Sequence, residues 1–145
     1  MRIEDLRKGD YVDLIFNDVG ENTRCIVVDI SINNREAIIR DLSNQSEFYV
    51  DSEEKWNFVK DIQMTESELR NLGFVYNSNK KVYMFPNNGA WEHPFGIIVT
   101  KYNGCYDLIL EDNNAFYGCK SIHIPYVHLL QNAVKDNYGL ELSYI

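Results

Sequence analysis

The sequence has few cysteines and no long apolar run, and each of these shortages excludes a class of protein. Its 145 residues include three cysteines and three prolines. The cysteines are odd in number and have no paired spacing, so the sequence predicts no disulfide scaffold. Apolar runs such as 97–99 and 108–110 have the length of strands, whereas a membrane helix needs about 20 residues. We therefore expect neither a disulfide-rich nor a membrane-spanning protein.

Basic residues are also scarce, because 14 lysines and arginines face 22 aspartates and glutamates for a net charge of −8. Residues 1–64 hold 8 basic and 14 acidic residues, and residues 65–145 hold 6 and 8. An acidic surface repels phosphate backbones, so we expect no direct binding of nucleic acid. Solubility alone accounts for such a charge, and a basic protein partner is the functional alternative. The charged start, residues 1–8, resembles no secretory signal and predicts a cytoplasmic protein.

The first half of the chain alternates as short strands do. The expected strands cover residues 11–16, 25–30, 37–42, 48–50 and 56–62, and polar turns separate them. Strands at intervals of about 8–12 residues are typical of a small antiparallel barrel. The segment from Leu6 to Val12 resembles the opening of many SH3-like barrels, with Gly9 in the tight turn. We therefore predict an SH3-like β-barrel domain over residues 1–64.

Residues 65–145 predict a second, α+β domain. Thr65 and Glu68 have the spacing of a capping box, and Gly73 is placed to end the helix that they begin. A hairpin is expected across residues 74–85 and another across 97–110, where Asn-Gly is the strongest turn signal in the chain. The fold class predicted for the whole chain is α+β, a small antiparallel barrel followed by an antiparallel sheet with two short helices.

The last quarter predicts a strand at 121–124, a helix with Pro125 at its first position, a stop at Gly139 and a final strand. Alternation favours Ile122 and Ile124 as core residues, so His123 is expected to face solvent.

Two motifs in this half carry a family resemblance. They are T-E-x-x-L-x-x-L-G-F and I-x-Y-V-H-x-L-Q-N, the second followed by G-x-E-L. The matching residues are Thr65, Glu66, Leu69, Leu72, Gly73, Phe74, Ile124, Tyr126, Val127, His128, Leu130, Gln131, Asn132, Gly139, Glu141 and Leu142. The chain resembles a group of small uncharacterised proteins of anaerobic gut bacteria and their phages and mobile elements. It departs from them at 133–137, where they carry more apolar residues. The resemblance implies this architecture and a mobile-element context, and it implies no activity.

Metal-binding and catalytic patterns are weak in this sequence. Zinc accepts cysteine and histidine ligands, but Cys105, Cys119, His93 and His123 lack the spacing of a specific site. His128 is expected to bond to neighbouring backbone instead. We predict no metal site and no cofactor site.

A nucleophilic set is the enzymatic alternative. Cys119 and His123, with Asp107 or Asp112, would form a Cys-His-acid arrangement. Because His123 is expected to face solvent, the sequence favours no catalytic residue, and we predict a protein that is not an enzyme.

The segment 87–95 is the most promising contact surface, because it gathers Trp91, His93 and Phe95 on one loop. Aromatic side chains supply large contact area at low entropic cost. The structural alternative is that Trp91 caps the sheet or fills the gap between the two halves of the chain. The candidate partner-binding residues are these three together with Tyr126 and His128.

Three functions follow in order of preference. The first is a non-enzymatic module that binds another protein. The second is an acidic decoy that occupies a DNA-binding surface of a host defence or regulatory protein, with affinity that falls steeply with salt. The third is an enzyme that uses Cys119 or His123.

Overall fold

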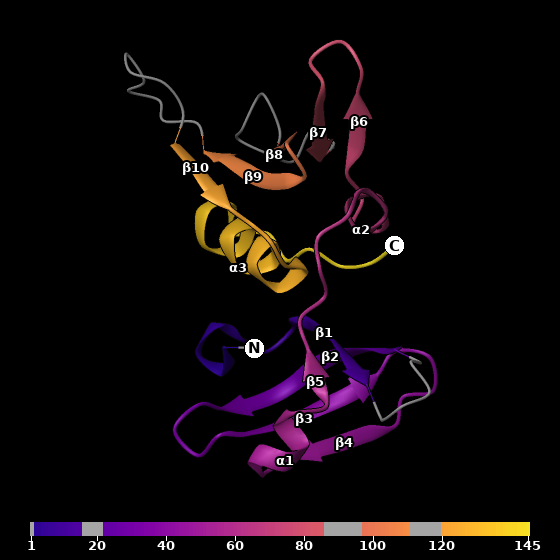
Figure 1. The fold of residues 1–145 in the computed structure, drawn as a ribbon, viewed down its shortest axis with the longest axis vertical. Helices are drawn as coiled ribbons and strands as arrows, with labels where there is room; N and C mark the ends of the chain where they lie inside the picture. Colours follow the sequence, from indigo (N-terminus) through magenta and orange to yellow (C-terminus); the bar gives the residue numbers. More distant parts are fainter. Residues whose placement is uncertain (1, 16–21, 86–96, 111–119) are drawn as a thin grey trace. The chain divides into compact units, whose positions relative to one another are not determined.

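The computed structural model describes residues 2–15, 22–85, 97–110 and 120–145. Two five-stranded antiparallel sheets and three α-helices make up this part of the chain, which confirms the α+β class (Figure 1). The chain divides into two compact units. The first comprises Met1–Gln63 with Tyr126–His128, and the second comprises Met64–Pro125 with Leu129–Ile145.

The sheet of the first unit curls into a half-barrel with the strand order β4-β3-β2-β1-β5. Four strands follow one another as neighbours, and the fifth returns to pair with the first. The elements of this unit are the 3-10 helix η1 (Ile3–Asp5), β1 (Tyr11–Ile15), β2 (Asn22–Ser31), β3 (Glu36–Asp41), β4 (Glu47–Val50), α1 (Glu53–Trp56) and β5 (Val59–Lys60).

One face of the half-barrel forms the core. Val12, Cys25, Ile39 and Val50 are fully buried in it. Cys25 is a core residue, and burial raises the pKa of its thiol to about 12, which disfavours the reactive thiolate. Gly9 adopts a φ of +95° in the predicted tight turn, where its N–H donates to the carbonyl of Val27 at 2.8 Å.

The last predicted strand of the first half is largely wrong. Its first residue, Trp56, ends helix α1 instead, and Ser52 Oγ caps that helix by accepting the N–H of Lys55. Trp56 is buried on this helix, and its Nε1 donates to the carbonyl of Arg35 at 2.7 Å. Only Val59 and Lys60 remain as strand β5.

The sheet of the second unit is a meander with the strand order β10-β9-β8-β7-β6. Helix α3 lies along one face of it, next to β9 and β10 (Figure 1). The elements are α2 (Glu66–Asn71), β6 (Val75–Asn77), β7 (Val82–Phe85), β8 (Ile97–Tyr102), β9 (Cys105–Leu110), β10 (Lys120–His123) and α3 (Val127–Tyr138). The last helix begins with two residues that belong to the first unit.

Local signals in this half are confirmed. Thr65 Oγ1 accepts the N–H of Glu68 at 3.2 Å and caps α2. Gly73 ends that helix with a φ of +94°, and the N–H of Phe74 donates back to the carbonyl of Leu69. Asn103 also has a positive φ, as a tight two-residue hairpin requires between β8 and β9.

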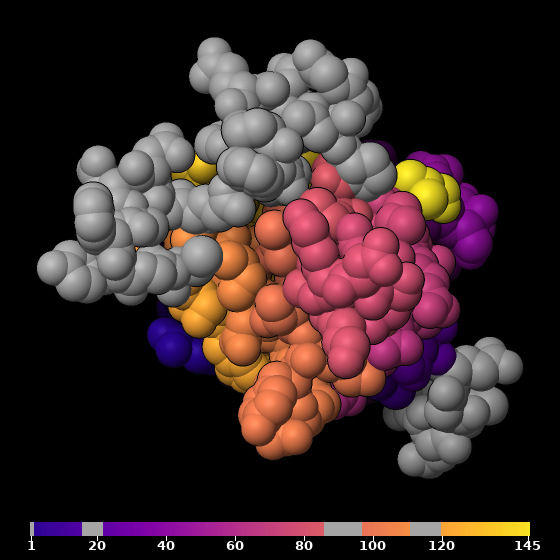
Figure 2. All heavy atoms as spheres, turned by 90° about the horizontal axis from the view of Figure 1, so that it is seen from above, coloured from indigo at the N-terminus to yellow at the C-terminus, as the bar shows by residue number. Residues whose placement is uncertain are grey.

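The core of the second unit lies on the face of the sheet that α3 covers. Its cross-strand row is Tyr83, Val99 and Leu108, and Leu130 and Val134 of α3 are fully buried. Figure 2 looks onto this unit from above, where residues of β6 and β7 (pink) lie beside those of β8 and β9 (orange). No described helix is long and apolar enough to cross a membrane.

Two expectations for the last quarter are wrong. Helix α3 begins at Val127, two residues after Pro125, because residues 125–127 bond to the segment 62–64. The final strand is absent from the described residues 139–145. Isolated hydrogen bonds contact that segment instead. Gln131 Nε2 donates to the carbonyl of Leu142, and the N–H of Ile145 donates to the carbonyl of Asn71.

Candidate functional site

Several of the residues singled out by the sequence lie outside the described part of the chain. These are Trp91, His93, Phe95, Asp112 and Cys119. The aromatic loop and the cysteine of the nucleophilic set therefore stay predictions.

His128 is buried beside a carboxylate. Its side chain is 2% exposed, and Nε2 lies 2.7 Å from Oδ1 of Asp61. The ring of Tyr126 stacks on it with centroids 5.8 Å apart. Nδ1 has no hydrogen-bond partner among the described residues. The expected bond to neighbouring backbone is therefore wrong, since the partner is a side chain 67 positions earlier in the chain. This geometry anchors the first turn of α3 and presents no ring nitrogen to a ligand.

His123 forms the second histidine–carboxylate pair. It is exposed, as predicted, and Nδ1 lies 3.3 Å from Oδ1 of Asp107 on the neighbouring strand β9. No group of three or more metal-binding side chains occurs within the described ranges. Cys105 is exposed on the same strand as Asp107 and forms no disulfide. The described residues thus place an exposed histidine beside Asp107, while Cys119 of the proposed nucleophilic set lies outside them.

A depression on the first unit is the best-formed candidate. It is open to solvent and holds about 320 Å³ where β2 ends, β3 begins and β4 ends. The residues that matter for its chemistry are Asp29, Ser31, Glu36, Ile38, Tyr49 and Asp51. Three acids and one aromatic ring thus line a cavity large enough for a side chain of a partner.

A cross-strand row crosses this depression. Asp29 of β2 pairs with Ile38 of β3, and Ile38 pairs with Tyr49 of β4. Residues directly opposite on neighbouring strands share a face of the sheet, and these three lie on the face away from the core. Tyr49 is 61% exposed, so its ring is open to a ligand on this face.

A β-bulge puts Asp29 in this row. The register between β2 and β3 shifts between Val27 and Asp29, so Val28 is the extra residue. Without the shift, Asp29 would stand opposite Ala37, which is buried in the core. With it, Ile30 takes the core position and Asp29 turns outward. The bulge therefore places an apolar side chain in the core and a carboxylate in the depression.

The three acids differ in how far they are already neutralised. Asp51 forms an ion pair with Lys55 at 2.9 Å, and this bond lowers the pKa of its carboxyl. Asp29 accepts the N–H of Ile30 with one oxygen. Neither Asp29 nor Glu36 has a cation within ion-pair distance among the described residues. Two carboxylates thus remain for a ligand.

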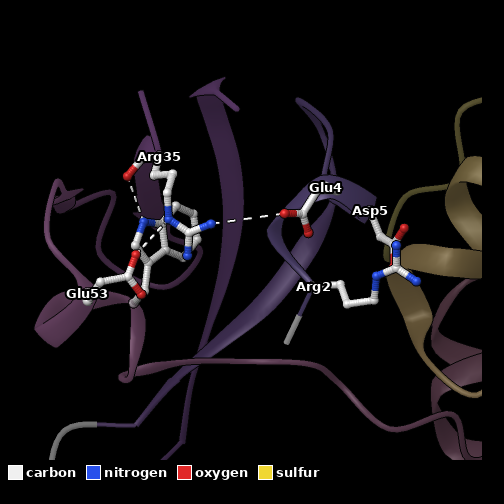
Figure 3. Close-up of polar contacts among 6 residues, drawn as sticks. Arg2, Glu4, Asp5, Arg35 and Glu53 are labelled. Atoms are coloured by element: carbon white, nitrogen blue, oxygen red, sulfur yellow. Dashed lines mark hydrogen bonds and ion pairs between the residues drawn. The ribbon is translucent and has the colours of Figure 1, made fainter. Parts of the chain in front are cut away.

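Arg35, the neighbour of Glu36 in sequence, forms its ion pairs with other residues. Arg35 Nε donates to Oε1 of Glu53 at 2.6 Å, and Nη1 lies 4.0 Å from Oε1 of Glu4 (Figure 3). Its backbone has a φ of +54°, which is uncommon outside glycine. The bond from Trp56 to its carbonyl and the ion pair with Glu53 both hold it there. The turn is thereby fixed, and Glu36 keeps its charge uncompensated by its neighbour.

Sequence reasoning missed the depression, although two signals were present. Asp29 interrupts the apolar run 25–30, and in the structure the core-facing positions of β2 change their spacing there from two to three, from Cys25 and Val27 to the partly buried Ile30, which is the mark of a bulge. The second signal is Tyr49 between Phe48 and Val50, since alternation must send one aromatic residue outward. What the sequence lacked was the cross-strand register.

Comparison with known proteins gives no match. No family model, no curated protein and no solved structure is similar to this chain.

Proposed function

We propose that the chain is a non-enzymatic module that binds a positively charged, extended segment of another protein in the depression of its first unit. The observation that carries the proposal is the pairing of an exposed ring, Tyr49, with the uncompensated carboxylates of Asp29 and Glu36 around one cavity. Aromatic faces and carboxylates together attract lysine and arginine side chains.

The position of β4 favours an extended ligand. This strand stands at the end of the sheet order and pairs with β3 on one side. An edge strand accepts an extended peptide through main-chain hydrogen bonds, and neighbouring pockets select its side chains. The depression lies at the end of this edge, so a bound strand would place every second side chain on the face that carries Tyr49.

The strand order supports an SH3-like character for the first unit, because the fifth strand returns to the first after a four-stranded meander. The two sequence motifs support a mobile-element context. Under this proposal the module acts by occupying a basic segment of its partner.

Titration with a basic peptide tests the proposal. The probe is a fluorescent ten-residue peptide that alternates threonine with lysine and arginine, and its counterpart carries glutamine at every basic position. We expect the basic peptide to bind the full chain with a Kd of about 10–100 μM at low salt, and the glutamine peptide not to bind.

Charge reversal in the depression supplies the variants. Asp29→Lys and Glu36→Lys should each weaken binding about tenfold, because each removes one attraction and adds one repulsion. Glu141→Lys is the matched control, since Glu141 is exposed on the second unit and pairs with Lys135. Equal binding by all variants, or no binding of the basic peptide, would contradict the proposal.

The same titration distinguishes the acidic decoy from a module that binds in the depression. A decoy uses many exposed acids, so Asp29→Lys and Glu141→Lys would weaken binding alike, and affinity would collapse between about 50 and 300 mM salt. A depression that also uses the Tyr49 ring retains part of its affinity at the higher salt, because the ring contact is not screened.

A further inference from the structure

We propose that the depression is built for one arginine side chain, whose guanidinium lies over Ile38 between the ring of Tyr49 and the carboxylate of Asp29. This inference rests on the proposed function and names the anchor of the bound segment. It is carried by the cross-strand row, the bulge and the charges around the cavity.

The width of the site follows from the sheet. Neighbouring strands lie about 4.8 Å apart, so Asp29 and Tyr49, on strands either side of β3, stand about 10 Å from each other. Ile38 lies between them and is half-buried. A side chain that fills this gap touches an aromatic ring on one side and a carboxylate on the other.

The chemistry of the two walls favours arginine over lysine. A guanidinium is planar, so it stacks on an aromatic face while its in-plane N–H groups donate to a carboxylate. It is also more weakly hydrated than an ammonium group, which lowers the cost of leaving water in an open depression. The aliphatic stem of the same side chain has the apolar surface of Ile38 to cover.

The three acidic residues of the depression differ in what each can offer the guanidinium. One oxygen of Asp29 already accepts the N–H of Ile30 at 3.0 Å, which fixes the carboxylate and leaves the other oxygen for the guanidinium. Glu36 pairs with Ser31 at the end of the same face and supplies the second carboxylate. Asp51 is already bonded to Lys55 and contributes little further attraction.

Three short peptides separate charge from shape. The probes are acetyl-Ser-Gly-Arg-Gly-Ser-amide and its counterparts with lysine or with citrulline, which is planar like arginine but neutral. Binding to the full chain is followed by amide chemical shifts. We expect the arginine peptide to bind at least about fivefold more tightly than the lysine peptide, and the citrulline peptide at least about tenfold more weakly than the arginine peptide.

Variants at the ring complete the test. Tyr49→Phe keeps the aromatic face and should leave the arginine preference intact, whereas Tyr49→Leu should reduce it to less than about twofold. Tyr102→Leu is the matched control, because Tyr102 is 76% exposed on the second unit. Tyr49 is itself exposed, so these variants should fold, and thermal unfolding checks that they do.

The outcomes distinguish the two proposals. Equal affinity for the arginine and lysine peptides, both lost in Asp29→Lys, would overturn the arginine anchor and leave the basic-segment proposal standing. Binding of none of the charged peptides would overturn both. Binding that shifts amides of the second unit alone would contradict the site.

Discussion

The two sheets of this protein have the same number of strands but use their outer faces differently. In the first unit the outer row Asp29, Ile38, Tyr49 combines a charge, an aliphatic group and an exposed ring. In the second unit the corresponding row is Met84, Ile98, Ile109, which is apolar and half-buried. The difference begins at a single bulge near the end of β2, which turns Asp29 outward after the apolar run 25–28.

The comparison shows that strand content does not decide where a site forms. Both sheets have a buried inner row of side chains, and both have a second row on the outer face. In the first sheet a charge and an exposed ring stand in register beside a depression, whereas the described outer row of the second sheet is apolar. Local backbone irregularity, rather than composition, therefore makes the first unit the binding candidate.

The largest effects should come from the two inner rows, which we expect to respond alike. Ile39→Ala in β3 and Leu108→Ala in β9 each remove a fully buried side chain. Each should lower the free energy of unfolding by about 2–5 kcal/mol, measured by urea denaturation. Ile32→Ala, at a position 38% exposed, is the control and should cost less than either. A mild loss at Leu108 alone would show that the second core is loosely packed.

The two histidine–carboxylate pairs sharpen the comparison. His128→Ala removes a buried ring and leaves Asp61 without its partner, so it should cost about 2–4 kcal/mol of unfolding free energy. His123→Ala breaks an exposed pair and should stay within about 0.5 kcal/mol. Chemical denaturation of the two variants measures these losses. Equal losses of unfolding free energy would contradict a structural role for His128.

Alkaline pH should act on the second unit through Tyr83. Desolvation and its bond to Glu66 raise the pKa of Tyr83 from its ordinary value of 10.0 to about 12. The folded state holds this proton more tightly than the unfolded state, so its contribution is complete below pH 10 and is lost as pH rises to 12. The loss should reach about 2–3 kcal/mol.

Tyr83→Phe removes the titrating group and should flatten this part of the stability curve. Tyr102→Phe, at an exposed position of β8, should keep the slope of the parent. Thermal melts between pH 9 and 12 give the comparison, and identical slopes in parent and Tyr83→Phe would refute the assignment.

The smallest expected effects are at the helix caps, one in each unit. Ser52 caps α1 and Thr65 caps α2, each by accepting an N–H three residues later. Alanine at either position should lower the free energy of unfolding by about 1 kcal/mol. Serine in place of Thr65 should restore most of the loss in α2, and no loss in either alanine variant would show that tertiary packing alone holds these helices.

Local signals predicted much of the fold. The cap at Thr65, the stop at Gly73 and the Asn103-Gly104 hairpin are set by nearest neighbours in sequence, and the structure confirms each. The predictions failed where distant residues decide. Trp56 ends a helix rather than beginning a strand because its ring packs in the core and bonds to Arg35, 21 residues away.

The candidate site depended on the same kind of long-range information. Asp29, Ile38 and Tyr49 are unremarkable in sequence, and only the register brings them into one row. His128 shows the converse, because its motif was visible but its buried partner, Asp61, was not.

The measurement that tests the central claim most directly is amide chemical-shift mapping of the full chain with the arginine peptide. The account predicts that the largest shifts fall on Asp29, Glu36, Ile38 and Tyr49, and that they vanish in the Asp29→Lys variant. Shifts that spread evenly over the acidic surface, or that survive this substitution, would contradict a built site in the first unit.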